Sequence, residues 1–323
     1  MPKILHTARY TGLPLEILKK ACPKGFSVKT LDEATEEQLI KEAVDADYFL
    51  VSGRLPINKT VLDNAPHLKM IQRTGVGTEM LDLEEIKQRG IPVYVNAGVN
   101  AQSVAEHTLT LILACLKRLP QINNQMHQGV WKKQQTGVTT RELKGKTVAL
   151  VGMGNIGRLV AQMLQAFGAK VVYTDVVRQT NETEQRLGLN YYESFERMLP
   201  VADILSFHCP LTAENTEILN GSTLAMMKDG SIVVNTARGK LINPHDLYDS
   251  LISGRLSAAA LDTHYEEPVK EGYLLSELVN VILTPHIGGL SYEAFQSMMV
   301  GAMKNIVAFD KGQYESISNV KYI

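Results

Sequence analysis

Residues 147–175 read TVALVGMGNIGRLVAQMLQAFGAKVVYTD. An apolar run at 147–151 is followed by Gly152, Gly154 and Gly157 in GxGxxG spacing. A helix-like segment at 158–166 precedes a second apolar run, which ends at Asp175. Glycines fall at this spacing by chance in many chains, but here they close one predicted strand and open a predicted helix. That context indicates a strand–turn–helix–strand unit of a parallel α/β sheet and disfavours a glycine-rich turn that binds nothing.

Each residue of the turn suits the binding of a dinucleotide. Gly152 permits a tight turn off the strand, Gly154 lets the backbone approach a pyrophosphate, and Gly157 lets the helix pack closely on the sheet. The N–H groups of Asn155 and Ile156 open the helix, where free donors and the helix dipole attract phosphate. The turn therefore predicts a dinucleotide site.

Asp175 decides which dinucleotide is expected. Its carboxylate can accept hydrogen bonds from the ribose hydroxyls of the adenosine half, and its charge repels a 2′-phosphate. NAD is therefore the expected cofactor. Arg178, three residues further on, keeps NADP open.

The composition excludes several classes of function. The chain has 323 residues, a net charge of −1 and 45% hydrophobic residues, which is ordinary for a soluble protein of two domains. No basic excess predicts a nucleic-acid partner, and no apolar run is long enough to predict a membrane span. Cys22, Cys115 and Cys209 are scattered, so we expect no metal site, no disulfide framework and a cytoplasmic location.

The strand–helix alternation occurs twice along the chain, which predicts two parallel sheets with crossover helices. The first series has predicted strands at 4–7, 27–30, 48–51, 69–72 and 93–95, and predicted helices at 13–20, 36–43, 59–64 and 83–89. The second series has predicted strands at 147–151, 170–174, 203–206, 231–235, 256–261 and 280–283.

Three segments lie outside this alternation. A long apolar helix is predicted at 101–119, and a polar stretch containing Trp131 follows at 121–141. A last helix is predicted at 292–309, and it either covers the second sheet or returns to the first domain.

Three polar residues of the second series each follow a predicted strand: Arg238, Glu267 and His286. Ligands of open α/β sheets bind at the carboxyl ends of the strands, so all three are expected on the binding face. Taken singly, they have ordinary alternatives: a surface arginine, a solvated Glu-Pro turn and a turn histidine. Their combination after the glycine turn is what points to chemistry.

The three residue types suit hydride transfer to a 2-oxo acid. The guanidinium of Arg238 can bind a carboxylate and a neighbouring carbonyl. His286 can give a proton to the developing alkoxide. Glu267 can orient that imidazole and favour its protonated form. The cofactor carries the hydride.

The chain resembles the NAD-dependent D-isomer-specific 2-hydroxyacid dehydrogenases, the superfamily of phosphoglycerate, glycerate and glyoxylate/hydroxypyruvate enzymes. The resemblance covers nearly the whole chain and rests on motifs in the family's order: RTGVG (73–77), NAGVNAQSVAEH (96–107), VALVGMGNIG (148–157), NTARG (235–239), ALDTHYEEP (260–268) and LTPHIGG (283–289).

The resemblance implies roles for individual residues. Arg238, Glu267 and His286 match the family's catalytic set, and the backbone N–H groups of Val76 and Gly77 match those that hold the substrate carboxylate. Further cofactor contacts are implied at Thr236, Ala237, Asp262, Gly288 and Gly289 on the nicotinamide side and at Cys209 on the adenosine side.

The resemblance also implies the architecture. The fold class is α/β, with two doubly wound parallel-sheet domains. Residues 99–290 correspond to a Rossmann NAD-binding domain, and residues 1–98 with 291–323 to a discontinuous, flavodoxin-like substrate-binding domain. Residues 101–141 correspond to the family's dimer contact, so a homodimer is expected.

The chain departs from the family pattern at three positions. Glu79 stands where the family usually has Asp, and Thr263 and His264 stand where it usually has Val and Phe. The formate dehydrogenase branch has Gln at the position of Glu267, so formate is not the expected substrate.

Substrate choice stays open at this level. Arg54 follows a first-domain strand and either meets a second anionic group of the substrate or is a solvated loop residue. We expect a small polar 2-oxo acid and its 2-hydroxy acid, with 3-phosphoglycerate/phosphohydroxypyruvate and glycerate/hydroxypyruvate as candidate pairs. The alternative function is that of a non-enzymatic, NAD-sensing binding protein of corepressor type.

Overall fold

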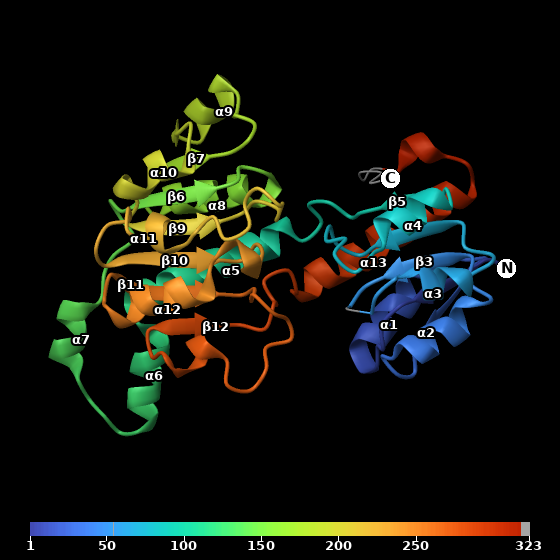
Figure 1. Cartoon of the computed structure of the whole chain (residues 1–323), viewed down its shortest axis with the longest axis horizontal. Helices are drawn as coiled ribbons and strands as arrows, with labels where there is room; N and C mark the ends of the chain where they lie inside the picture. The colour runs from blue at the N-terminus through green and yellow to red at the C-terminus, as the bar shows by residue number, and fades with distance from the viewer. Residues whose placement is uncertain (54, 318–323) are drawn as a thin grey trace. The chain divides into compact units, whose positions relative to one another are not determined.

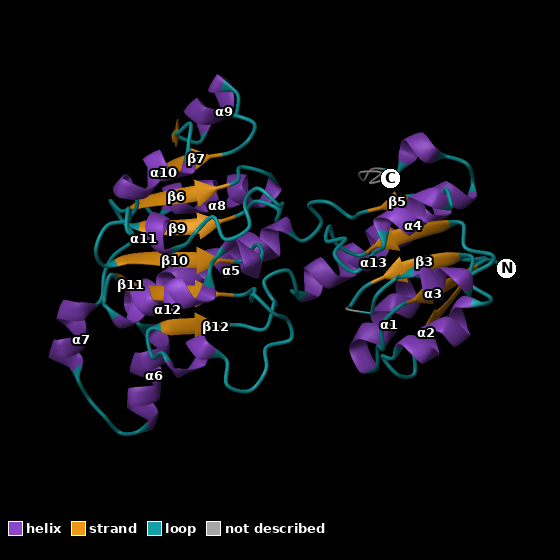
Figure 2. Cartoon of the chain, in the orientation of Figure 1, coloured by secondary structure: helices purple, strands orange, loops and turns teal. Residues whose placement is uncertain are grey.

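The computed structural model describes residues 1–53 and 55–317 and divides the chain into two compact units (Figure 1). The first unit comprises Met1–Asn100 with the described part of Ser291–Ile323, and the second unit comprises Ala101–Leu290. Each unit contains one parallel sheet with helices on it (Figure 2). The predicted fold class, two parallel α/β sheets, is confirmed.

The first unit is built on a five-stranded sheet in the order β2-β1-β3-β4-β5. Its strands are β1 (Lys3–His6), β2 (Ser27–Thr30), β3 (Tyr48–Val51), β4 (Met70–Arg73) and β5 (Val93–Tyr94). Its first helices are α1 (Gly12–Ala21), α2 (Glu36–Ala43), α3 (Lys59–Asp63) and α4 (Leu83–Gln88). Every residue of β3 is buried, as expected for a central strand with both faces covered.

Helix α13 (Tyr292–Asp310) belongs to the first unit, which resolves the two alternatives for the last predicted helix. Met298, Met299 and Ile306 of this helix pack in one cluster with residues of α1, β1 and β3. A buried hydrogen bond of 3.1 Å from Asn305 Nδ2 to Gln72 Oε1 fixes the helix to β4. The described chain ends with a short helical turn, η4 (Tyr314–Ser316).

The second unit is built on a seven-stranded sheet in the order β12-β11-β10-β9-β6-β7-β8. Its strands are β6 (Thr147–Val151), β7 (Lys170–Thr174), β8 (Leu189–Tyr191), β9 (Ile204–Phe207), β10 (Ser231–Asn235), β11 (Leu256–Leu261) and β12 (Val281–Leu283). The strand order reverses between β6 and β9, and the carboxyl ends of the strands at such a reversal are where open α/β sheets bind ligands.

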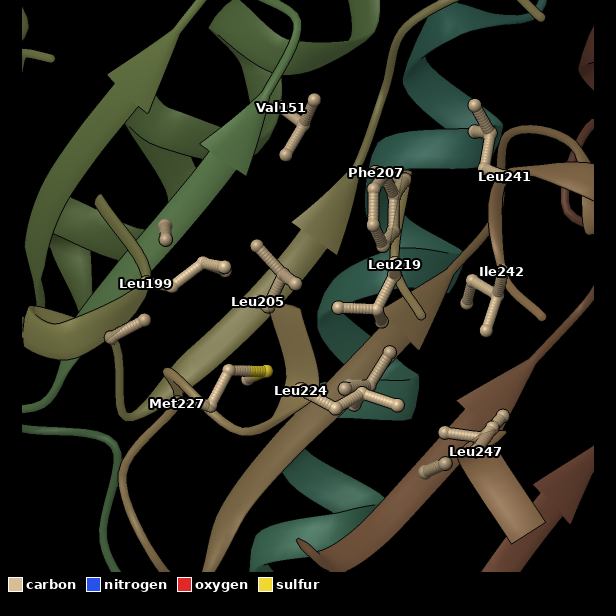
Figure 3. Packing of buried hydrophobic residues seen from close by; sticks show 14 of the residues in the cluster. Val151, Leu199, Leu205, Phe207, Leu219, Leu224, Met227, Leu241, Ile242 and Leu247 are labelled. Carbon is tan, nitrogen blue, oxygen red and sulfur yellow. The ribbon is translucent and has the colours of Figure 1, made fainter. Parts of the chain in front are cut away.

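Helices cover both faces of this sheet. One face packs on α5 (Ala101–Lys117) and α8 (Asn155–Ala166). The other face forms the cluster in Figure 3, where Leu205 and Phe207 of β9 pack with Leu224 and Leu247 from the helical side. The remaining elements of the unit are α9 (Asn181–Arg186), α10 (Phe195–Met198), η1 (Leu199–Val201), α11 (Gly221–Leu224), η2 (Gly239–Leu241), α12 (Pro244–Ile252) and η3 (Leu274–Glu277).

The segment after α5 differs from the prediction. The expected helix at 101–119 ends at Lys117, Arg118 has a left-handed backbone (φ 51°), and a new helix, α6 (Leu119–His127), begins. Pro120 lacks the N–H that would continue α5 by bonding to the carbonyl of Leu116, and that carbonyl instead accepts the N–H of Arg141 at 2.9 Å. The expected polar stretch also contains α7 (Lys133–Thr139).

Within residues 1–53 and 55–317, no helix has the length and apolar character that crossing a membrane requires.

Candidate active site

The glycine turn between β6 and α8 has the shape that its spacing predicts. Gly152 has a φ of 98°, and a Cβ there would lie 2.7 Å from the carbonyl of His208. A Cβ on Gly157 would lie 2.2 Å from the carbonyl oxygen of Gly152, so the helix packs on the turn more closely than any side chain allows. Gly154, the N-cap, has open space around its Cβ position and no side chain to cap the first turn. This cradle fits a pyrophosphate.

Asp175 follows β7 and lies beside this turn. Its Oδ2 accepts the N–H of Met153 at 2.5 Å, and its Oδ1 accepts the N–H of Val177 at 3.1 Å. A carboxylate has about four acceptor sites, so acceptor capacity for ribose hydroxyls is left over.

Arg178, the residue for which NADP remained a possible cofactor, is paired with Glu184. Its Nε and Nη2 donate to the two oxygens of Glu184 at 2.9 Å each, and its guanidinium lies 5.0 Å from the ring centre of Tyr191. A guanidinium held in this bidentate pair is less available to a 2′-phosphate.

Glu267 and His286, predicted separately from two strand ends, are brought together in the second unit. His286 Nδ1 lies 2.8 Å from Glu267 Oε2. His286 also has a left-handed backbone, with φ at 57°, a conformation that non-glycine residues adopt rarely and at an energetic cost. Such strain in a polar residue at a strand end is common at functional sites.

Arg238 follows β10 at the same edge of the sheet and is half-buried. Its Nη1 donates to the carbonyl of Ala237 at 2.8 Å, and its own carbonyl accepts Asn235 Nδ2 at 2.8 Å. These bonds anchor the backbone and guanidinium at the turn after β10.

Asp262, predicted as a cofactor contact, is 1% exposed and lies beneath the turn that carries His286. Its oxygens accept the hydroxyl of Thr284 at 2.6 Å and the N–H groups of Ile287 and Gly288 at 2.9 and 2.8 Å. Although burial opposes it, donation from His107, Thr284 and the two N–H groups lowers the pKa of Asp262 to about 2. The carboxylate therefore stays charged and fixes the turn, and its direct contact with cofactor remains a prediction.

The other predicted cofactor residues lie at neighbouring strand ends. Thr236 and Ala237 are buried after β10, and the Thr236 hydroxyl lies 2.9 Å from that of Thr108. Cys209 follows β9, and burial raises the pKa of its thiol to about 11. Gly288 and Gly289 are in the His286 turn, where a Cβ on Gly288 would lie 2.9 Å from Asp262 Oδ2.

The predicted substrate residues belong to the first unit. Val76 is half exposed in the turn after β4, and the carbonyl of Gly77 accepts Arg73 Nε at 2.5 Å. Arg54 lies outside the described residues.

Two polar residues of the second unit were not predicted. His107 of α5 lies 3.1 Å from the Thr284 hydroxyl through its Nε2, and its position in the AEH of the motif at 96–107 was the available signal. His208 lies beside the glycine turn, and its Nδ1 is buried without a partner among the described residues. Burial lowers the pKa of His208 to about 3, so this ring is neutral.

The fold, the glycine cradle and the strand-end residues define an NAD-binding oxidoreductase. The family model described as "D-isomer specific 2-hydroxyacid dehydrogenase, NAD binding domain" matches residues 109–288. The chain belongs to this family, and the resemblance predicted from its motifs is confirmed. It is an NAD-dependent enzyme that transfers a hydride between NAD(H) and a D-2-hydroxy acid/2-oxo acid pair.

Relatives of the chain match over most of its length. It is 35% identical over 299 residues to a glyoxylate reductase from Thermococcus litoralis, covering 91% of this chain and 86% of that one. It is 33% identical over 279 residues to a hydroxypyruvate reductase from Thermotoga maritima, covering 86% and 89%. The crystal structure of the TT0316 protein from Thermus thermophilus matches with a TM-score of 0.84 and 32% identity, covering 96% and 97%.

Proposed function

We propose that the protein reduces a small polar 2-oxo acid with NADH, with His286 as the proton donor, Glu267 as its orienting partner and Arg238 as the substrate-binding cation. The observation that carries the proposal is the 2.8 Å pair of His286 Nδ1 and Glu267 Oε2 at the carboxyl ends of the parallel strands. NAD, when bound, supplies or accepts the hydride.

The pair determines which nitrogen of His286 exchanges a proton with the substrate. Because Nδ1 of His286 faces Glu267, Nε2 is the ring nitrogen that remains for substrate. In the reducing direction Nε2–H gives its proton to the substrate oxygen as negative charge develops there, and in the oxidising direction Nε2 takes it back. The nearby carboxylate compensates the charge of the imidazolium while the proton is held.

Arg238 is proposed to bind the substrate before the reaction and to stabilise the negative charge that develops on the substrate oxygen. Its guanidinium can bind the substrate carboxylate and carbonyl at once. We also propose that the N–H groups of Val76 and Gly77 bind the carboxylate, and that the first unit is the substrate-binding domain and the second the NAD-binding domain.

For the substrate, we propose glyoxylate or hydroxypyruvate. The relatives that support this choice bear those names and match the chain over most of both lengths. Phosphohydroxypyruvate is the alternative, and it would require a second cation for its phosphate.

The test is NADH oxidation by the purified protein, followed by the loss of NADH absorbance, against glyoxylate, hydroxypyruvate, phosphohydroxypyruvate, pyruvate and larger branched or aromatic 2-oxo acids. The proposal expects the highest kcat/KM with glyoxylate or hydroxypyruvate and a D-configured product from the latter. A preference for phosphohydroxypyruvate would overturn the substrate assignment. Oxidation with none of these acids would overturn the proposed function.

We further propose that the protein is a cytoplasmic homodimer. Three free cysteines support a reducing compartment. Exposed apolar side chains on and between α6 and α7 support a contact with a second copy, and they are Leu119, Met126, Trp131 and Val138.

A further inference from the structure

His264 occupies a position where the family usually has Phe, and its side chain is not free. The residue is 7% exposed and lies in the turn after β11. Its Nε2 lies 2.9 Å from the carbonyl oxygen of Thr284, an acceptor only, so Nε2 carries the proton and donates. The ring thus ties the turn after β11 to the turn after β12.

His264 contacts both members of the catalytic pair through hydrogen bonds at or next to them. The carbonyl of Thr284 that receives the His264 ring also accepts the backbone N–H of His286 at 3.0 Å. The backbone N–H of His264 donates to Glu267 Oε1 at 2.9 Å, while Oε2 of that same carboxylate faces His286. One residue therefore holds Glu267 through its backbone and the base of the His286 turn through its ring.

A second side chain fixes the tautomer of His264. With the proton on Nε2, Nδ1 can accept a hydrogen bond, and the Tyr273 hydroxyl lies 3.4 Å from it. The two rings meet edge to face, with centres 5.5 Å apart and planes at 87°. Burial and the charge of Glu267 raise the pKa of Tyr273 to about 12, which keeps its hydroxyl protonated and able to donate.

We propose that His264 is a positioning residue for the Glu267–His286 pair, holding the strained His286 backbone in register with the carboxylate through the Thr284 carbonyl. The inference rests on the proposed function of that pair. His264 touches neither substrate nor cofactor in this proposal, and it acts through alignment alone. The φ of 57° at His286 gives the reason why such a hold is needed, since that backbone is unfavourable on its own.

The test compares His264→Phe, which keeps an aromatic ring but has no donor, with His264→Gln, whose side-chain N–H can reach the same carbonyl. Because His264→Phe loses the hydrogen bond that aligns the pair, we expect its kcat to fall by about tenfold while the Kd for NADH is unchanged. His264→Gln is expected to recover most of the lost kcat. Tyr273→Phe, which frees Nδ1, gives a smaller decrease. His245→Gln, on the exposed surface of α12, is the control and keeps the wild-type kcat.

A second readout separates this inference from the proposed function. The ring resonances of His286, assigned by their loss in His286→Ala, are expected to shift in His264→Phe and to return in His264→Gln. If the wild type reduces 2-oxo acids while His264→Phe keeps both kcat and the His286 resonances, the positioning inference is wrong and the function stands. If the wild type reduces no 2-oxo acid, but the His286 resonances shift in His264→Phe and return in His264→Gln, the proposed function is wrong and the positioning inference stands.

Discussion

The buried side chain of His6 links the stability of the first unit to pH. It is 0% exposed, its Nε2 lies 2.5 Å from the Ser52 hydroxyl, and its Nδ1 lies 3.3 Å from the Thr30 hydroxyl. Burial lowers the pKa of His6 from 6.5 to about 4, and a backbone hydrogen bond with Ala8 opposes this only in part. The ring is therefore neutral in the folded protein near pH 7.

We predict that this histidine makes the protein less stable between pH 6.5 and 4. In that window the unfolded chain binds a proton that folded His6 does not, so its contribution is complete above pH 6.5 and falls as the pH approaches 4. The loss reaches about 3 kcal/mol at most. Urea unfolding from pH 7 to 4 should give a shallower pH dependence for His6→Gln than for the wild type.

The comparison with the wild type is needed because His208, with its pKa lowered to about 3, contributes in the same direction. His245→Gln, at an exposed site, should follow the wild-type curve. Parallel curves for His6→Gln and the wild type would contradict the prediction.

Single residues also show where sequence reasoning stops. That Glu267 and His286 would meet followed from each residue's place after a strand of one parallel sheet. That Asp262 would turn inward did not follow, since the apolar residues that precede it, 258–261, have no alternation that would indicate which face is buried. The role proposed for His264 could not be predicted either, because its hydrogen-bond partner is a backbone carbonyl, which no residue type in the sequence indicates.

At the scale of elements, the turn that carries His286 depends on one buried carboxylate. Asp262 accepts a hydroxyl and two N–H groups from residues 284–288, within a turn whose histidine has an unfavourable backbone. Removing one acceptor leaves a buried donor without a partner, which costs about 1–3 kcal/mol.

We therefore predict that Asp262→Asn lowers both stability and turnover. The amide group of Asn presents N–H to backbone N–H, so one of these contacts becomes repulsive. The expected result is a loss of about 1–3 kcal/mol in the free energy of unfolding and a drop in kcat of about tenfold or more. Asp249→Asn, exposed on α12, is the control. Wild-type kcat in Asp262→Asn would show that the turn does not need the carboxylate.

Many strands and helices with a buried face could be predicted from the sequence, whereas two helices without one, α6 and α7, could not. The apolar runs predicted β10 and β11 with the bounds that the structure has. Helices α6 and α7 bury no residue within this chain, so they have no apolar stripe facing a core, and their sequence predicts only a polar stretch. Strand β8 was missed because it lies at the edge of the sheet and buries only Leu189, so it has no apolar run.

At the scale of the whole molecule, the segment from α6 to α7 predicts self-association. Its exposed apolar residues include Trp131 and Val138, with 74% and 75% of their surfaces exposed. We predict that sedimentation equilibrium gives about twice the chain mass of 35.7 kDa and that Trp131→Lys weakens the dimer. Leu13→Lys, at an exposed apolar site of α1, should leave the dimer unchanged. A wild type that sediments as a single chain would contradict the prediction.

The reaction class could be inferred from the sequence because the glycine turn and the motifs that contain Arg238, Glu267 and His286 follow one another in the order typical of the family. The substrate could not, since the sequence position of Arg54, whose charge would distinguish a phosphate-bearing acid from hydroxypyruvate, fits a substrate contact and a solvated loop residue equally well.

The most direct test of the proposed chemistry is the turnover of His286→Ala beside its affinity for NADH. If the imidazole delivers the proton and Glu267 orients it, the substitution lowers kcat by about 100-fold or more with the preferred 2-oxo acid. The Kd for NADH, measured by fluorescence titration, stays within about twofold of the wild type, since the glycine cradle is intact. A kcat equal to that of the wild type would contradict the role of His286 as proton donor.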